Sequence, residues 1–124
     1  MTTANGVYHT RDMKNHHGGM VYLDGFVYGS SGDILSCVNL KTGQPTWRER
    51  SMKGSVVYAD GKIVFRHEGG DVVLLAAKSD SYQELGRFVQ PDRSSRPAWS
   101  HPVIANGQLF LRDMDKLLVY NIAK

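Results

Sequence analysis

Two adjacent histidines are the first side chains in the sequence that could bind a ligand. His16 and His17 lie in the polar stretch MKNHHGG. Imidazole nitrogens bind transition metals, and a carboxylate from Asp33, Glu68 or Asp71 would complete such a site. The alternative is a polar loop in which both rings satisfy backbone groups. We expect the polar loop, so no metal-ligating residue is assigned.

A second candidate is the run His67-Glu68-Gly69-Gly70-Asp71. It places carboxylate oxygens around a flexible turn, and oxygen atoms are the ligands that calcium takes. Glycine and aspartate are also the ordinary residues of tight turns. A turn between strands is therefore the expected structure here, with calcium as the alternative.

The longest connection in the sequence, QPDRSSRPAWS at 90–100, carries Arg93, Arg96 and Trp99 and is followed by His101. Two guanidinium groups and an indole ring could hold an anionic ligand or a sugar by charge and stacking. Alternatively the loop closes over the end of a sheet, with Trp99 packed beneath it. The sequence contains no Ser/His/Asp order, phosphate-binding glycine loop or CxxC pair, so no catalytic residue is predicted.

Composition limits the classes of partner. The 124 residues carry a net charge of +3 without a run of Lys or Arg, which does not favour a nucleic-acid partner. Cys37 is the single cysteine and lies in an apolar strand pattern, so we expect a buried thiol. No apolar stretch approaches the roughly 18 residues that a membrane span needs. The first residues show no signal-peptide pattern, so we expect an intracellular protein or a portion of a longer one.

The elements that position these residues repeat along the chain. The two-residue hairpin turns Asp24-Gly25, Asp60-Gly61 and Asn106-Gly107 each join two short apolar runs. Their spacing is typical of propeller blades, and the closeness of the turns excludes βαβ units. We therefore predict an all-β fold, a β-propeller segment of about three four-stranded antiparallel blades. Its twelve short strands form one domain over 1–124: a lone strand at 6–13, blades at 19–50 and 54–89, and a three-stranded blade at 101–122 that lacks its outer strand.

Three blades cannot close a ring, because a closed propeller needs roughly four to eight. Open blade edges also invite pairing with other strands. We therefore expect further blades as partners, either from the rest of a longer propeller or from copies of the chain in a homo-oligomer.

The loops of a four-stranded blade alternate between its two faces. One face then collects both long connections and the turns between second and third strands. We expect a partner or small-molecule ligand to bind on this loop-rich face, because function usually resides on such loops. Its candidate residues are His16, His17, Asp33, His67, Glu68, Asp71, Arg93, Arg96, Trp99 and His101.

The segment CVNLKTGQPTW resembles the repeat of quinoprotein-like (PQQ-like) β-propellers, which has the form Ala-x-Asp-x-x-Thr-Gly-x-x-x-Trp. Thr42, Gly43 and Trp47 match it, whereas Cys37 and Asn39 replace its Ala and Asp. Thr42-Gly43 should form the turn before the outer strand, and Trp47 should pack between neighbouring blades. The second unit lacks this pattern, with Phe88 as a possible substitute for the Trp. The segments from Lys53 onward are similar to the closing, C-terminal blades of bacterial members.

The resemblance implies two functions from different classes. The first is a non-catalytic binding or scaffolding module, which we favour, since fold alone does not bring an activity. The second is the C-terminal part of a PQQ- or metal-dependent oxidoreductase that acts on alcohols or sugars. Such relatives hold PQQ with calcium and use a Trp floor, an aspartate base and often a vicinal disulfide. No residue here matches the base or the disulfide. The resemblance also favours a periplasmic or secreted location.

Overall fold

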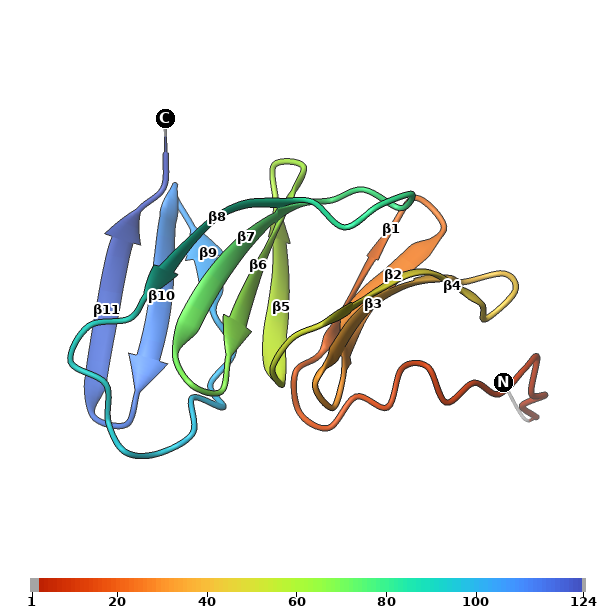
Figure 1. The fold of residues 1–124 in the computed structure, drawn as a ribbon, viewed down its shortest axis with the longest axis horizontal. Coiled ribbons are helices and arrows are strands. Elements are labelled where there is room, and N and C mark those ends of the chain that lie inside the picture. Colours follow the sequence, from red (N-terminus) through yellow and green to blue (C-terminus); the bar gives the residue numbers. More distant parts are fainter. Residues whose placement is uncertain (1–2, 124) are drawn as a thin grey trace.

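The computed structural model describes residues 3–123, and these form three antiparallel sheets and no helix (Figure 1). Each sheet is a meander whose neighbours in space are neighbours in sequence. The first contains β1 (Met20–Leu23), β2 (Phe26–Ser31), β3 (Ile34–Asn39) and β4 (Pro45–Arg50). The second contains β5 (Gly54–Ala59), β6 (Lys62–His67), β7 (Asp71–Ala76) and β8 (Glu84–Val89). The third contains β9 (Val103–Ala105), β10 (Gln108–Asp113) and β11 (Lys116–Asn121). Within residues 3–123 there is accordingly no helix that could cross a membrane.

The predicted hairpin turns begin each sheet. Asp24, Asp60 and Asn106 have φ values of 48°, 51° and 50°, and each is followed by a glycine that also has positive φ. Both central residues of a type I′ turn need this conformation, and its twist matches that of the two strands it joins. The all-β, three-sheet prediction is therefore confirmed.

The lone N-terminal strand was predicted wrongly: residues 6–13 form no strand, so the described chain has eleven strands rather than twelve. Val7 is 89% exposed and packs against no sheet. The Tyr8 hydroxyl donates a hydrogen bond to the carbonyl of Leu40, and its ring lies against Gly43. Side-chain contacts hold the rest of this segment beside the first sheet: the carboxylate of Asp12 pairs with Arg48 of β4, and the sulfur of Met13 lies next to Gly29 of β2. No strand of the described residues pairs with its backbone.

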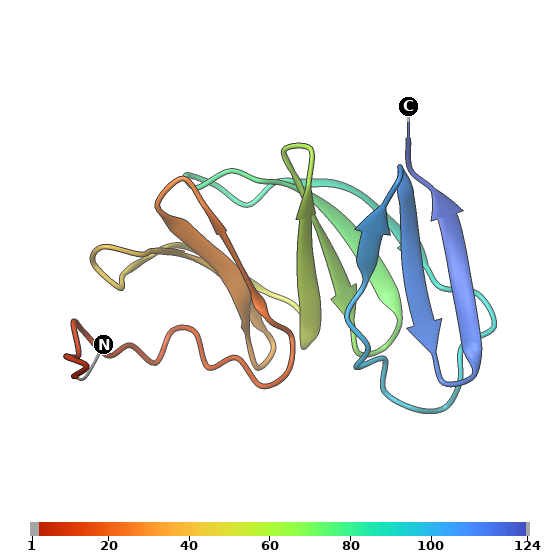
Figure 2. The same cartoon turned by 180° about the vertical axis from the view of Figure 1, so that it is seen from behind.

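The sheets lie side by side as blades, and they do not close into a ring (Figures 1 and 2). β5 packs against β1 and β2 of the first sheet and against β9 of the third. The middle sheet therefore buries both of its faces, which explains why the β6 sequence KIVFRH does not alternate with polar residues. Its Ile63 and Phe65 face the first sheet, whereas Val64 faces the third.

Two apolar cores lie between the sheets. The core between the first and second sheets contains Tyr28, Leu35, Cys37 and Phe65, all almost fully buried. Cys37 is buried, as expected, and burial raises the pKa of its thiol. The smaller core between the second and third sheets contains Val64, Val72, Leu109 and Leu111.

One end of the three sheets carries the long connections. The β2–β3, β6–β7 and β10–β11 turns lie there together with the segments before β1 and between β8 and β9 (Figures 1 and 2). The Asp-Gly and Asn-Gly hairpin turns lie at the opposite end. We call the first end the loop face.

Candidate functional site

Three separate loops meet on the loop face and bring five side chains together. His16 and His17 come from the segment before β1, Glu68 from the β6–β7 turn, and Trp99 and His101 from the connection between β8 and β9. We call these five residues the loop-face cluster. Each sheet or its flanking connection contributes to the cluster, so it forms only when the sheets are packed side by side.

His17 lies at the centre of the loop-face cluster. Its Nε2 is 3.5 Å from Oε1 of Glu68, and its Nδ1 is 3.1 Å from Nδ1 of His16. Its ring packs at a tilt on the indole of Trp99, with ring centroids 5.6 Å apart. The carbonyl of His17 contacts Nε2 of His101 at hydrogen-bond distance. One residue from the first loop is thereby linked to the other two loops.

Glu68 fixes the orientation of the Trp99 indole. The indole Nε1 donates a hydrogen bond of 2.8 Å to Glu68 Oε1, and the amide of Ala98 donates one of 2.8 Å to the Glu68 carbonyl. Trp99 nevertheless remains 56% exposed. An oriented, exposed indole is an anchor of the kind that binding surfaces use, since it offers a large contact area with little loss of conformational entropy.

The charge of the cluster depends on His17. Burial lowers the pKa of His17, and the neighbouring His16 lowers it further, whereas Glu68 acts in the opposite direction. His17 is therefore neutral at neutral pH, and Glu68 is the carboxylate of the cluster. This combination of a neutral imidazole, a carboxylate and an indole provides hydrogen bonds and stacking.

A hollow of about 470 Å³ adjoins Trp99 on the loop face. Pro97, Trp99 and Ser100 line it from the connection between β8 and β9, and Arg112 and Asp115 from the end of the third sheet. The volume is within the range of small-molecule sites. Trp99 is therefore both a member of the cluster and a wall of a ligand-sized hollow.

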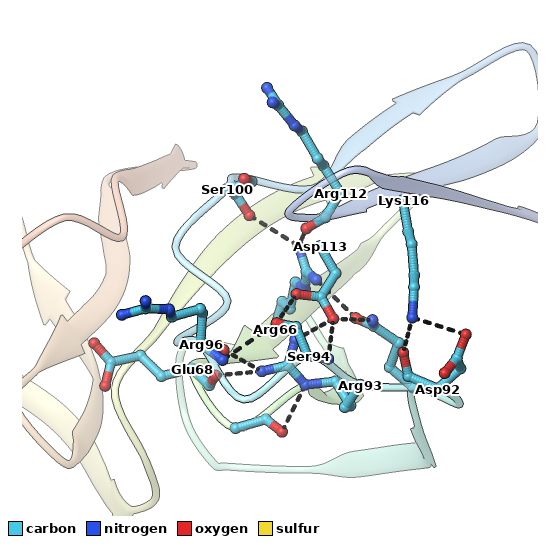
Figure 3. A network of polar contacts seen from close by, with 12 residues as sticks. Arg66, Glu68, Asp92, Arg93, Ser94, Arg96, Ser100, Arg112, Asp113 and Lys116 are labelled. Carbon is cyan, nitrogen blue, oxygen red and sulfur yellow. Dashed lines mark hydrogen bonds and ion pairs between the residues drawn. The ribbon is translucent and has the colours of Figure 1, made fainter.

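A buried polar network supports the loop that carries Trp99 (Figure 3). Arg66 is fully buried and donates hydrogen bonds of 3.1 and 2.7 Å to the carbonyls of Ser100 and Arg112. It also donates one of 2.7 Å to the side chain of Gln90, whose amide donates one of 3.1 Å to Asp113. Arg66 thus ties the second sheet to the connection before β9 and to the last residues of β10, both at the loop-face end of the third sheet.

Asp113 holds the same loop from the third sheet. Ser94 donates to its carboxylate from both the backbone amide, at 2.8 Å, and the hydroxyl, and Nη1 of Arg93 lies 2.7 Å away (Figure 3). Burial alone would raise the pKa of Asp113, but the Ser94 hydrogen bonds and the Arg93 charge together lower it to about 2. The carboxylate is therefore ionised at neutral pH, as the guanidinium beside it requires.

The side chains of the other predicted site residues do not join the cluster, although Arg93 contacts the backbone of Glu68. The Arg93 guanidinium donates hydrogen bonds to the carbonyls of Glu68, Gly69 and Arg96, so contacts within the protein already use its donors. Asp71 lies 3.5 Å from Arg87 on the outer strand of its sheet. Asp33 and Arg96 are exposed outside the cluster, with the backbone carbonyl of Asp33 accepting a hydrogen bond from the amide of Ser51, whereas His67 is buried.

His67 illustrates why a position in a turn sequence does not place a side chain on the face. It ends β6, its ring packs edge-on against Phe65 at 4.8 Å, and it shares a hydrogen bond of 3.0 Å with the hydroxyl of Ser51. Burial lowers its pKa, and Arg87 lowers it further. His67 is therefore a neutral core histidine.

The residues present do not fit a calcium-bound quinone. Calcium takes six to eight oxygen ligands. The loop-face cluster supplies a single carboxylate, Glu68, which already accepts the Trp99 hydrogen bond. Among residues 3–123, no three His, Cys, Asp or Glu side chains gather to hold a metal ion. No step of a reaction is assigned to PQQ or to a metal here.

The residues that carry the repeat pattern lie away from the loop face, around the β3–β4 turn. Asn39 Oδ1 accepts hydrogen bonds from the amides of Lys41 and Thr42, and Gly43, at φ 72°, donates to the Asn39 carbonyl at 2.8 Å. Asparagine thus forms the turn that an aspartate forms in the repeat. Trp47 then packs between the first two sheets.

The Trp47 indole has three contacts that define its site. Its ring lies 6.1 Å from Tyr28 and 5.6 Å from Tyr82, and its Nε1 donates a hydrogen bond of 2.9 Å to the carbonyl of Lys78. Tyr82 and Lys78 belong to the connection between β7 and β8. Trp47 therefore joins one blade to the next.

No known family profile matches this chain, and no curated protein matches it. Solved structures do. A europium-containing methanol dehydrogenase superposes with a TM-score of 0.68 and 16% identity over 86% of this chain. This likeness shows the fold alone, which is an open, propeller-like segment of antiparallel sheets. The computationally designed proteins Ika8 and Ika4 superpose with TM-scores of 0.60 and 0.57, at 14% and 12% identity, over 83% and 84% of the chain. The chain spans 23%, 32% and 64% of these three proteins, in the order given.

Sequence reasoning missed the buried network, above all Arg66 and Gln90. The one available signal was an arginine inside the apolar strand sequence KIVFRH, where an unpaired charge would be costly. The acceptors for that arginine come from the loop before β9 and from β10, and only the tertiary fold identifies them.

Proposed function

We propose that the chain is a non-catalytic binding module of the PQQ-like propeller class, and that it presents the loop face to a ligand or partner. The observation that carries this proposal is the oriented and exposed indole of Trp99. Its Nε1 is bonded to Glu68, its ring packs on His17, and a hollow of about 470 Å³ lies beside it. The walls of the hollow are an indole, charged side chains and the hydroxyl of Ser100, which suit stacking and hydrogen bonding to a ligand, so binding is the activity that we propose.

A sugar is the ligand class that suits this hollow. A flat pyranose face packs on an indole, and hydroxyl groups pair with polar side chains at its edge. Arg112, Asp115 and Ser100 line the hollow and supply both donors and acceptors. The buried Arg66–Gln90–Asp113 network keeps the loop in place, so the site is largely formed before a ligand arrives.

The test is a titration of the 124-residue chain with neutral disaccharides, in which binding is monitored through the NMR chemical shifts of the backbone amides. We expect saturable shifts at Trp99, Ser100 and Asp115, and we expect Trp99→Ala to weaken binding at least tenfold. Trp99→Phe, which keeps a ring but loses the Glu68 bond, should give an intermediate value. Shifts that do not saturate, or that are the same in Trp99→Ala, would remove the sugar site.

The oxidoreductase alternative is tested on the same protein. It rests on the fold shared with a methanol dehydrogenase. After incubation with PQQ and calcium, followed by desalting, we expect neither quinone absorbance nor dye-linked activity with alcohols or sugars. If the protein retains quinone absorbance and shows activity, the binding-module proposal is wrong and the oxidoreductase alternative is supported.

Further blades are the partners that we propose for the sheets themselves. β11 ends the third sheet with one edge unpaired among the described residues, and Leu117 and Val119 on it are 66% and 47% exposed. An edge of this kind accepts another strand, from further blades or from a second copy. Sedimentation equilibrium should detect concentration-dependent association, and a strict monomer at high concentration would exclude self-association.

A further inference from the structure

The two spaces between the three sheets are built to one plan but are filled differently. Cys37 pairs with Trp47 across β3 and β4, and Leu74 pairs with Gly86 across β7 and β8. A register shift follows immediately in both sheets, between Cys37 and Val38 and between Leu74 and Leu75. Gly86 therefore occupies the position in the second sheet that Trp47 occupies in the first.

The hydrogen-bond acceptor of that indole also has a counterpart. The amide of Ala77 donates to the Gly61 carbonyl at 3.1 Å, and the amide of Ile122 donates to the Gly107 carbonyl at 2.9 Å. Ala77 and Ile122 are thus equivalent, and the residue after each is equivalent too. Lys78, whose carbonyl accepts from Trp47, corresponds to Ala123.

The indole of Trp47 fills a position between the first and second sheets. The equivalent position between the second and third sheets is part of a cleft. The cleft is about 720 Å³, lies between the second and third sheets, and includes Gly86 and Ala123 among its walls. A Cβ added to Gly86 would meet no atom within 4 Å. The other walls are mostly aliphatic: Val64, Val72, Leu74, Ile104, Leu109 and Ile122.

Phe88 does not substitute for the missing tryptophan. It pairs with Val72, so its equivalent in the first sheet is Glu49, which pairs with Leu35. Its ring packs on Tyr120, with centroids 4.8 Å apart. Phe88 closes one wall of the cleft and leaves the indole position open.

We propose that this cleft binds a planar bicyclic aromatic molecule of the indole type. The ring would lie between β7–β8 and the third sheet against Leu74 and Leu109, and its N–H would donate to the carbonyl of Ala123. The site lies at the end of the sheets opposite the loop face, next to the Asp60-Gly61 and Asn106-Gly107 turns. It is therefore distinct from the Trp99 hollow and independent of what that hollow binds.

Indole itself is the probe for this site. In an NMR titration of the 124-residue chain, we expect saturable shifts at Leu74, Gly86, Leu109 and Ala123, with half-saturation at about 1 mM or below for a fragment of this size. N-methylindole has the same ring without the donor, so it should bind about threefold to tenfold more weakly.

Gly86→Trp supplies the missing side chain and should abolish indole binding while raising the midpoint of thermal unfolding. Gly86→Ala is the matched control and should bind within about twofold of the original chain, because a methyl group leaves the cleft open. Should Gly86→Trp fail to fold, Ile122→Trp narrows the cleft from its other wall and should also weaken binding. Shifts centred elsewhere, no saturation, or an unchanged affinity in a folded Gly86→Trp protein would overturn the proposal.

Discussion

Replacing Asp113 by asparagine tests the buried network that holds the loop face. Asp113 is 2% exposed and accepts hydrogen bonds from Ser94 and Gln90, with Arg93 beside it. Asparagine has nearly the same shape, but it brings an NH₂ group against these donors and leaves the Arg93 charge without its carboxylate. Gln90 also connects Asp113 to the fully buried Arg66. The substitution therefore removes the negative charge that offsets the positive charges of both Arg93 and Arg66.

The expected loss of unfolding free energy at pH 7 is about 3 kcal/mol. Breaking one partner of a buried ion pair costs about 3–5 kcal/mol. The lower end applies because Arg93 keeps three backbone carbonyl acceptors, on Glu68, Gly69 and Arg96. The expected loss is a large part of the total stability of a domain of this size.

Asp113 also makes the free energy of unfolding depend on pH. The pKa of Asp113 falls from 3.8 to about 2 on folding, so the unfolded chain binds more protons than the folded one. The stabilisation is complete above about pH 5 and is lost as the pH falls to 2. The shift corresponds to about 2.5 kcal/mol at full burial, and we expect about 1–2 kcal/mol because solvent screens the Arg93 loop.

Urea unfolding at pH 7, 5, 3 and 2 measures both effects. We expect the difference between the original chain and Asp113→Asn to be largest at pH 7 and to shrink by about 1–2 kcal/mol towards pH 2. Asp115→Asn makes the same chemical change two residues away on an exposed turn, and it should stay within about 0.5 kcal/mol of the original chain. A cost below about 1 kcal/mol at pH 7, or a difference that does not change with pH, would refute the reasoning.

Three further outcomes follow from single side chains. Trp47→Ala should cost about 2–4 kcal/mol in urea unfolding, and Trp47→Phe, which loses only the Nε1 bond and part of the ring, less than half of that. His67 has a lowered pKa, so its NMR titration midpoint should lie below 6.5. Stability should then fall as the pH drops below 6.5, and His67→Phe should reduce that fall. Gly18→Ala places a Cβ 1.9 Å from the Gly54 carbonyl oxygen and should destabilise the chain by at least about 2 kcal/mol, whereas Gly86→Ala should be near neutral.

The sheets could be predicted because their signals are local. Asp-Gly and Asn-Gly pairs favour positive φ at both positions, and such a pair between two short apolar runs forms a hairpin turn, so Asp24, Asp60 and Asn106 fixed the hairpins and hence the meander order. Residues 6–13 were misread because Val7 and Tyr8 suit a strand by composition. A strand also needs a partner edge, and no local feature of the sequence reveals whether one is free.

The candidate site could be predicted only to the level of its face. Alternation of loops placed His17, Glu68 and Trp99 at one end of the sheets, but it could not distinguish them from His67, whose ring turns into the core. Arg66 was missed for the converse reason. Its partners lie far away in the sequence, so a buried arginine with three hydrogen bonds across the fold looks the same in sequence as one on a surface.

Because the sheets repeat, a position without a large side chain in one sheet can be recognised by comparison with the equivalent position in another. Strand register equates Gly86 with Trp47 and Ala123 with Lys78 without reference to any other protein. In the first interface, an indole covers the apolar core and bonds to a backbone carbonyl at the turn. In the second, the corresponding apolar walls surround a cleft. Glycine in a strand interior weakens the strand and supplies no side chain to pack, and it also allows a ligand to approach closely. Gly86 therefore lowers stability as long as the cleft is empty. A bound aromatic ring would make, in the second interface, the contacts that the Trp47 indole makes in the first.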